Sequence, residues 1–277
     1  MNIEPYQIKF DPNFPSILFE LGISIVFSTY QAGKLMSLGS LDGDKLHQIP
    51  ISFKKPMGIA TKDDNIAVAC LDEIEVFGRN NFIAEQKSLN DKKFDSFYIS
   101  RITYNTSSLD IHDLDFGQNK IWGVNTMFSC LVTFDMSANF VYKWKPSFIS
   151  EIVPEDRCHL NGMAMQDDLP RFVTALSKTN HKDGWRSDIM NSGVLLEVPS
   201  SSIILEGLSM PHSPRFYNND LYLLTSGNGQ LIKVDVTNKK YDLIYDFGKP
   251  RRIRHLDMFD YKAFINARIP RVKNEKG

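Results

Sequence analysis

The stretch from Ile121 to Asp135, IWGVNTMFSCLVTFD, decides the fold of this 277-residue chain. An apolar run rich in β-branched and aromatic residues is followed by a small polar turn and a second alternating run, and this pattern predicts a β-hairpin. The same pattern recurs at 24–38, 65–78 and 221–235, and in two halves at 171–177 and 193–198. A polar insertion from Lys178 to Ser192 separates those two halves.

A short segment precedes each later hairpin, and an apolar run follows most of them. The preceding segments begin at Met57, His112, His159, His212 and His255. The following runs are FIAEQ from Phe82, FVYKW from Phe140, SIILEGL from Ser202 and YDLIY from Tyr241. Units of four short strands repeated every ~40–50 residues predict the blades of a β-propeller, each with an inner strand, a hairpin and an outer strand. We expect one all-β propeller domain over residues 1–277.

The number of blades depends on two partial units at the ends of the chain. The N-terminal unit, 24–51, lacks an obvious inner strand, and the C-terminal unit, 255–267, lacks its outer hairpin half. The sequence predicts six blades with an incomplete last blade. The alternative is five blades, with the two partial units combined. Because an incomplete blade exposes strand edges, we expect a second copy of the chain, in a homo-oligomer, to cover it.

Little helix is expected. The one helical pattern runs from Asn13 to Leu21, with Asn13 as its N-cap, Pro15 in its first turn and Gly22 at its end. No second helix is predicted. Residues 268–277 form a basic tail, and 249–277 carries nine basic residues against three acidic ones. We expect this tail to be solvated or docked on the domain rather than bound to phosphate.

Composition excludes several classes of protein. The contents of hydrophobic residues, 42%, and charged residues, 23%, are ordinary for a globular domain. A net charge of −1 gives no general attraction to nucleic acid. We see neither a membrane-spanning stretch nor a signal peptide, so we expect no membrane partner and a cytoplasmic location. The three scattered cysteines suit reduced, buried thiols rather than disulfides or a zinc ribbon.

Four of the five inner segments begin with histidine, namely His112, His159, His212 and His255. Because the inner strands of a propeller start near its axis, we expect these side chains to converge. Imidazole is a good ligand for divalent transition metals, so the four histidines are predicted to hold Fe, Zn, Mn or Cu. The alternatives need no cofactor: the histidines make structural or ligand hydrogen bonds, or they serve acid–base catalysis.

Polar residues beside the histidines complete the predicted site. The predicted catalytic residues are Asp113, Asp156, Arg157 and Asn161. The predicted substrate-binding residues are Arg215, Tyr30, Gln31 and Arg254. A carboxylate can orient a histidine or move a proton, and an arginine can grip a carboxylate or phosphate by bidentate contact. The alternative for each arginine is a salt bridge between blades.

Five strings of the chain resemble a bacterial family of conserved hypothetical proteins that is described as β-propeller-like and has no assigned function. They are STYQAGKL (28–35), PMGIA (56–60), VNTMFSCL (124–131), PSFISEIVPEDRCHLNGMAM (146–165) and GLSMPHSPR (207–215). The resemblance extends from about Phe14 to Ala267, and it implies a propeller but no substrate or catalytic role. The similar proteins continue beyond the segment AFINAR, so this chain differs from them at the last blade.

The sequence therefore predicts an enzyme that modifies a small molecule or peptide at the mouth of the central channel and depends on a metal held by the histidines. The alternative is a non-catalytic binding module or assembly scaffold. In that interpretation, the insertion from Lys178 to Ser192, with Trp185, is the contact loop.

Overall fold

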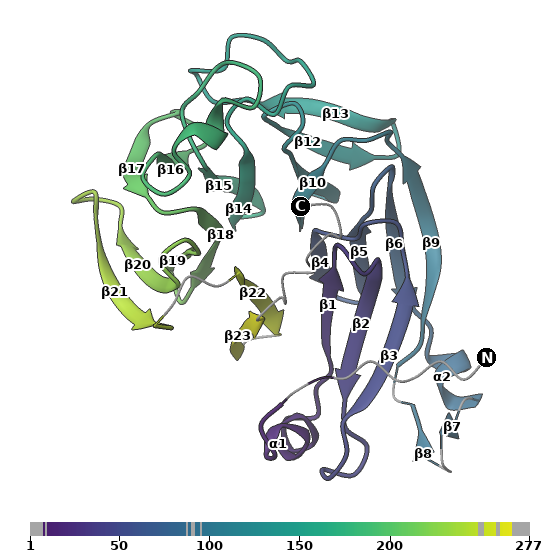
Figure 1. The fold of residues 1–277 in the computed structure, drawn as a ribbon. Coiled ribbons are helices and arrows are strands. Elements are labelled where there is room, and N and C mark those ends of the chain that lie inside the picture. The colour runs from purple at the N-terminus through teal and green to yellow at the C-terminus, as the bar shows by residue number, and fades with distance from the viewer. Residues whose placement is uncertain are drawn as a thin grey trace, which may run out of the picture.

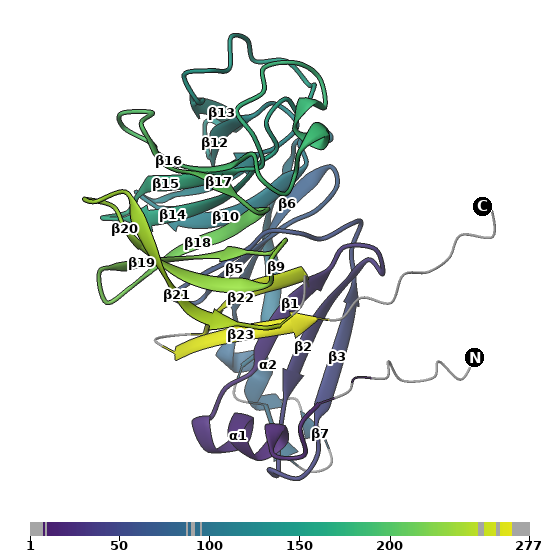
Figure 2. The ribbon, with the colours of Figure 1, turned by 60° about the vertical axis from the view of Figure 1, so that its left-hand side comes forward.

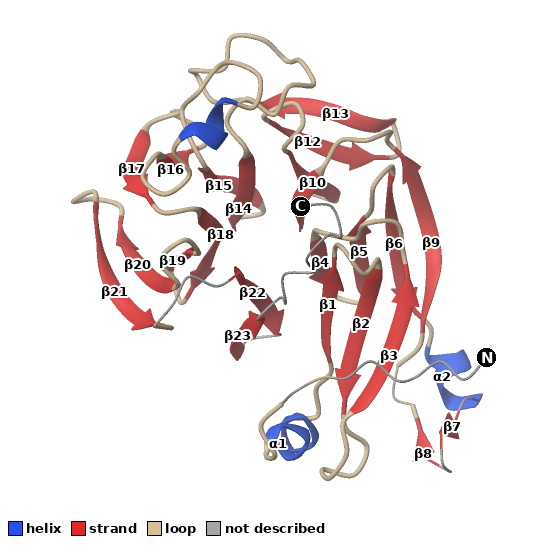
Figure 3. Ribbon diagram, viewed as in Figure 1, coloured by secondary structure: helices blue, strands red, loops and turns tan. Residues whose placement is uncertain are grey.

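The computed structural model describes residues 8, 10–86, 88–89, 92–94, 96–248, 252–258 and 261–267, and for 88–89, 92–93, 252–258 and 261–267 it describes the backbone alone. Strands form most of its regular structure and lie in sheets arranged around a common centre (Figures 1 and 3). The predicted all-β propeller with four-stranded blades is confirmed. Among the described residues, no helix has the length and apolar character needed to cross a membrane.

Four blades have four antiparallel strands each, in chain order. Blade II contains β4 (Ile59–Lys62), β5 (Asn65–Ala69), β6 (Glu73–Arg79) and β9 (Tyr98–Asn105). Blade III contains β10 (Ile111–Gly117), β11 (Lys120–Asn125), β12 (Cys130–Asp135) and β13 (Ala138–Trp144). Blade IV contains β14 (Leu160–Gln166), β15 (Leu169–Ala175), β16 (Gly193–Glu197) and β17 (Ile203–Leu208). Blade V contains β18 (Pro211–Tyr217), β19 (Asp220–Thr225), β20 (Gln230–Asp235) and β21 (Lys240–Asp246).

The two ends of the chain form smaller sheets. Blade I has three strands, β1 (Ile25–Thr29), β2 (Lys34–Gly39) and β3 (His47–Ser52). The C-terminal hairpin pairs β22 (Arg252–Met258) with β23 (Tyr261–Ala267) and lies between blades V and I, where β22 contacts β1, β18 and β19 (Figures 1 and 2). The described strands thus form five blades, which is the number in the alternative prediction, although the two partial units remain separate sheets. The main prediction of six blades is not confirmed.

The N-terminal helix is present as predicted. Helix α1 (Phe14–Leu21) has proline in its first turn and ends at Gly22, whose φ of 61° is the left-handed conformation that glycine adopts without steric cost. Asn13 precedes the helix, but its side chain makes no capping hydrogen bond. The predicted basic tail, 268–277, lies outside the described residues.

The outer strand predicted from Phe82 is wrong, because that segment forms helix α2 (Asn81–Gln86). The Asn80 side chain accepts a hydrogen bond of 3.0 Å from the Ile83 backbone, which is the capping interaction that starts a helix. A small sheet of β7 (Ser88–Leu89) and β8 (Lys92–Lys93) follows, and the strand that pairs with β6 is β9. The other three predicted outer strands are present as β13, β17 and β21.

The core lies between the faces of neighbouring blades. Ile74 of blade II packs with Leu114 and Phe134 of blade III, and similar apolar clusters join blades III to IV and IV to V. The inner strands β4, β10, β14 and β18 contact one another in series, so the first strand of each blade lies nearest the axis. Their approach is close at Gly162, where a Cβ atom would lie 2.9 Å from the Ser213 nitrogen. This packing fixes the positions of the residues that open each inner strand.

Candidate functional site

Blades III, IV and V begin their inner strands in the same way, and the residues there define what we call the axial site. Asp110, His159 and Met210 have left-handed backbone conformations, with φ of 54°, 51° and 48°. Each carbonyl accepts a hydrogen bond from the backbone of the residue that follows the neighbouring strand. The inner strand starts at the next residue in each case. Asp110, His159 and Met210 are therefore equivalent positions in the three blades.

The histidines occupy more than one place in this register. His112 and His212 lie two residues after the left-handed position and correspond to Asn161 in blade IV, whereas His159 is itself at the left-handed position. His255 lies in the middle of β22, and its side chain is outside the described residues. When the inner segments are aligned by sequence alone, all four histidines fall at the same position. The strand pairing is irregular near the starts of β10, β14 and β18, so equal spacing in the sequence does not give equivalent positions in the blades.

His112 is almost enclosed, with 9% of its side chain exposed. Its Nδ1 atom lies 2.8 Å from the Thr126 hydroxyl and 3.1 Å from the Asp110 carbonyl oxygen. The Thr126 hydroxyl donates its own proton to the Leu160 carbonyl at 2.5 Å. Both neighbours of Nδ1 therefore act as acceptors, so Nδ1 carries the proton and the lone pair of the neutral ring is on Nε2.

His159 and Trp185 share one carboxylate oxygen. His159 Nδ1 donates to Asp156 Oδ2 at 2.8 Å, and Trp185 Nε1 donates to the same oxygen at 2.9 Å. The indole also stacks on the imidazole, with ring centres 4.2 Å apart and planes inclined by 32°. The His112 ring lies 4.8 Å from the His159 ring at 79°. Asp156 thus fixes both the orientation and the tautomer of His159.

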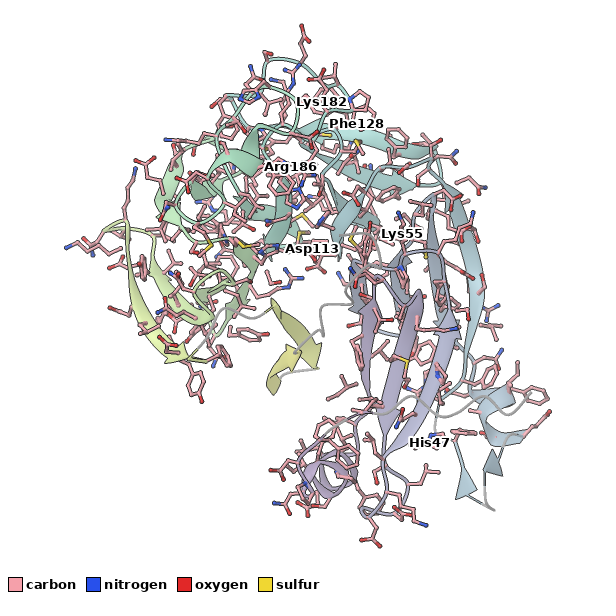
Figure 4. The ribbon with its side chains drawn as sticks, in the orientation of Figure 1. His47, Lys55, Asp113, Phe128, Lys182 and Arg186 are labelled. Carbon is pink, nitrogen blue, oxygen red and sulfur yellow. The ribbon has the colours of Figure 1, made fainter. Side chains whose placement is uncertain are left out.

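The insertion between β15 and β16 forms a roof over this histidine. It contains the short helix η1 (Gly184–Ser187), which carries Trp185. The Arg186 guanidinium lies 4.1 Å from the centre of the Trp185 ring and donates to Asp183 at 3.1 Å. In Figure 4, Arg186 is seen near the middle of the ring of blades, whereas His47 lies far out on blade I. The segment predicted as a contact loop therefore belongs to the axial site.

Arg157 supports the roof through several hydrogen bonds. Its Nε donates to Glu155 at 2.8 Å, and its Nη1 donates to Asn180 at 2.9 Å and to Ser150 at 3.0 Å. Its carbonyl accepts from the Thr179 hydroxyl at 2.5 Å. These contacts join the loop before β14 to the start of the insertion. The catalytic role predicted for Arg157 stays a prediction; the observed contacts anchor the insertion.

Asp113 and Arg215 form a bidentate ion pair that crosses blade IV. Arg215 donates to both carboxylate oxygens of Asp113, at 2.8 and 2.9 Å, and to the Met163 carbonyl at 2.6 Å. Asp113 also accepts from the Met163 backbone at 2.9 Å. The three residues come from β10, β14 and β18, so the pair ties three inner strands together. Of the two interpretations of this arginine, the geometry is that of a salt bridge between blades.

Two predicted catalytic residues have enclosed polar atoms. Asn161 is 2% exposed, and its Oδ1 accepts from the Thr174 hydroxyl at 2.7 Å. Asn161 Nδ2 and Asp156 Oδ1 are shielded from solvent and have no hydrogen-bond partner in the described part of the chain. Leaving such atoms unpaired costs free energy that other contacts of the fold offset.

The loops before the inner strands of blades II and III add two charged groups, Lys55 and Asp110, that sequence reasoning missed. Lys55 Nζ lies 5.7 Å from the ring centre of Tyr30, which is exposed with Gln31 in the turn between β1 and β2. Burial raises the pKa of Asp110, and the charges of His159 and Lys55 oppose this rise. The position of Lys55 just before the inner segment of blade II is the signal that could have identified it. Its left-handed conformation, with φ of 46°, is the one that opens the inner strands of blades III, IV and V.

The predicted metal ligands are only partly brought together. His212 Nδ1 lies 2.9 Å from the Met210 carbonyl, so this nitrogen also carries a proton. The described residues contain no group of three or more His, Cys, Asp or Glu side chains placed to hold one metal ion. The side chains of Arg254 and His255 lie outside those residues. The observed contact between predicted ligands is that of His112 with His159.

Comparison with known proteins identifies a family and also finds solved structures of low similarity. A family model described as "Domain of unknown function (DUF4915)" matches residues 12–276. No curated protein matches the chain. A solved streptogramin B lyase is 12% identical over 82% of this chain and 66% of its own, with a TM-score of 0.47. Virginiamycin B lyase from Staphylococcus aureus is 12% identical over 81% and 67%, with a TM-score of 0.45. This chain thus spans slightly less than two thirds of the first of these structures.

Proposed function

The chain belongs to the family described as Domain of unknown function (DUF4915), and from the axial site we propose that it is an enzyme that transfers a proton on a small-molecule or peptide ligand. His159 is the general base. The observation that carries the proposal is the hydrogen bond of 2.8 Å from His159 Nδ1 to Asp156 Oδ2. A histidine held in this way presents a basic Nε2 atom, and the carboxylate stabilises the imidazolium that forms.

The step needs no oxidant or cofactor. His159 Nε2 takes a proton from a C–H, O–H or N–H group of the ligand, and the resulting imidazolium returns a proton to another atom of the ligand or its leaving group. Asp156 stays ionised and holds the ring. Lys55 adds a positive charge beside Tyr30, on the blade II side of the site.

A divalent metal at the same place is the second candidate. The observation that favours it is that Nδ1 of His112, His159 and His212 is in each case held by an oxygen atom, as the outer partners of metal-binding histidines are. The Nε2 atoms of these histidines are therefore the ones that would bind the metal. Since the described residues provide no group of three ligands, this version depends on His255 and stays a prediction.

The proposal is tested by substrate profiling. Purified protein is incubated with a cell metabolite extract and with a peptide mixture in D2O, and mass spectrometry follows consumption and solvent deuterium uptake. His159→Gln is compared with His47→Gln, a matched histidine control on β3. We expect wild type and His47→Gln to consume the same compound, and His159→Gln to lose roughly 10²–10⁴-fold in rate.

Two results would overturn the proposal. Consumption that survives His159→Gln unchanged would remove the histidine from the chemistry. A compound that binds in a thermal-shift assay but is not altered by wild type would favour the binding-module alternative over the enzyme.

A further inference from the structure

Trp185 makes two separate contacts with the His159–Asp156 pair, and both act on the histidine. Its Nε1 donates to the same Oδ2 atom that accepts from His159, and its ring stacks on the imidazole at 4.2 Å. A carboxylate that holds two donors on one oxygen cannot rotate without breaking both bonds. The indole therefore limits the motion of the group that orients the base, and it also covers one face of the base.

The roof that carries this tryptophan is held at both of its ends. At its start, the Asp183 backbone donates to the Glu155 carbonyl at 3.0 Å, beside the contacts of Arg157 described above. At its end, the Ser192 hydroxyl donates to the Leu176 carbonyl at 2.7 Å, and the Ile189 carbonyl accepts from the Met210 backbone at 3.2 Å. The position of the indole is thus set by the fold before a ligand arrives, which is the requirement for a group that orients others.

We infer that Trp185 is a positioning residue of the axial site: it locks the Asp156 carboxylate on His159 and closes one face of the imidazole, so that a ligand reaches the ring along its Nε2 edge. This rests on the proposed function in naming His159 as the reactive group. An approach in the ring plane is the geometry that proton transfer to Nε2 needs, because the lone pair lies in that plane. The sequence insertion in blade IV therefore serves as part of the site.

The test uses the full chain and three tryptophan variants. Trp185→Ala removes both contacts, and Trp185→Phe keeps the stacked ring but removes the N–H donor. Trp144→Phe, in the outer strand of blade III, is the matched control. Diethyl pyrocarbonate is the probe, and peptide mapping gives the carbethoxylation rate of His159 with His47 as an internal reference. Nitrogen-15 spectra of labelled histidine report which ring nitrogen of His159 carries the proton.

We expect Trp185→Ala to raise the modification rate of His159 by roughly tenfold relative to His47, and to mix its two tautomers, because the Asp156 carboxylate that loses its second donor is free to rotate away from Nδ1. Trp185→Phe should mix the tautomers with a smaller change in rate, and Trp144→Phe should change neither. Wild-type rates and a single tautomer in both Trp185 variants would overturn the inference. If Trp185→Ala does not fold, the tautomer in Trp185→Phe decides. Neither readout requires turnover, so failure here is distinguishable from failure of the proposed function.

Discussion

Replacing Arg215 with methionine should destabilise the whole propeller. The Asp113–Arg215 pair is buried, with side-chain exposures of 10% and 14%, and joins blades III and V across blade IV. Removing one partner leaves a buried carboxylate without its counter-charge, which costs about 3–5 kcal/mol. For a chain of this size, 1 kcal/mol corresponds to a change in Tm of about 2–4 °C. We expect Arg215→Met to lower Tm by about 10 °C.

The measurement is thermal and urea unfolding followed by circular dichroism, with an exposed ion pair as control. Lys178 and Glu206 are 2.6 Å apart but 46% and 63% exposed, so Lys178→Met should cost less than about 1 kcal/mol. The double variant Asp113→Asn/Arg215→Met should recover part of the loss, because it removes the unpaired charge. If Arg215→Met costs no more than Lys178→Met, the pair does not hold the blades together, and the anion-binding role predicted for Arg215 regains support.

Four further expectations follow from the structure. Burial raises the pKa of Asp110, so the stability that this carboxyl contributes decreases as pH rises from about 3.9, its pKa in the unfolded chain, through its pKa in the folded protein. Asp110→Asn should therefore be more stable than wild type in unfolding curves at pH 7 and should lose that advantage at pH 3. Gly117→Ala places a methyl group against a backbone carbonyl of blade IV and should cost about 1–3 kcal/mol in urea unfolding. Burial raises the pKa of all three cysteines to about 12, so a thiol reagent at pH 7 should label none of them in native protein and all of them in urea; rapid native labelling would contradict this burial. If the metal version is correct, elemental analysis of aerobically and anaerobically purified protein should find a transition metal that His159→Ala and His212→Ala lose, and absence of metal from both wild-type preparations would refute it.

Part of the candidate site could be predicted from the sequence. Asp156, His159 and His112 were all singled out, and the structure places them together because inner strands start beside the axis. Asp113 and Arg215 were also singled out, but the sequence could not show that they satisfy each other. Their partner choice depends on three strands from different blades, a relation that no local pattern contains.

The sequence by itself determined the repeating hairpins, the order of strands in blades III to V and the helix α1, because these depend on alternation, turn residues and helix signals within a few positions. Only the tertiary structure decided the register of the inner strands, which separates His159 from His112, and the placement of Trp185 on it. The insertion that carries Trp185 has no periodic pattern. Its position comes from hydrogen bonds to the neighbouring loop and blade, and such long-range contacts exist only once the blades have packed around their axis.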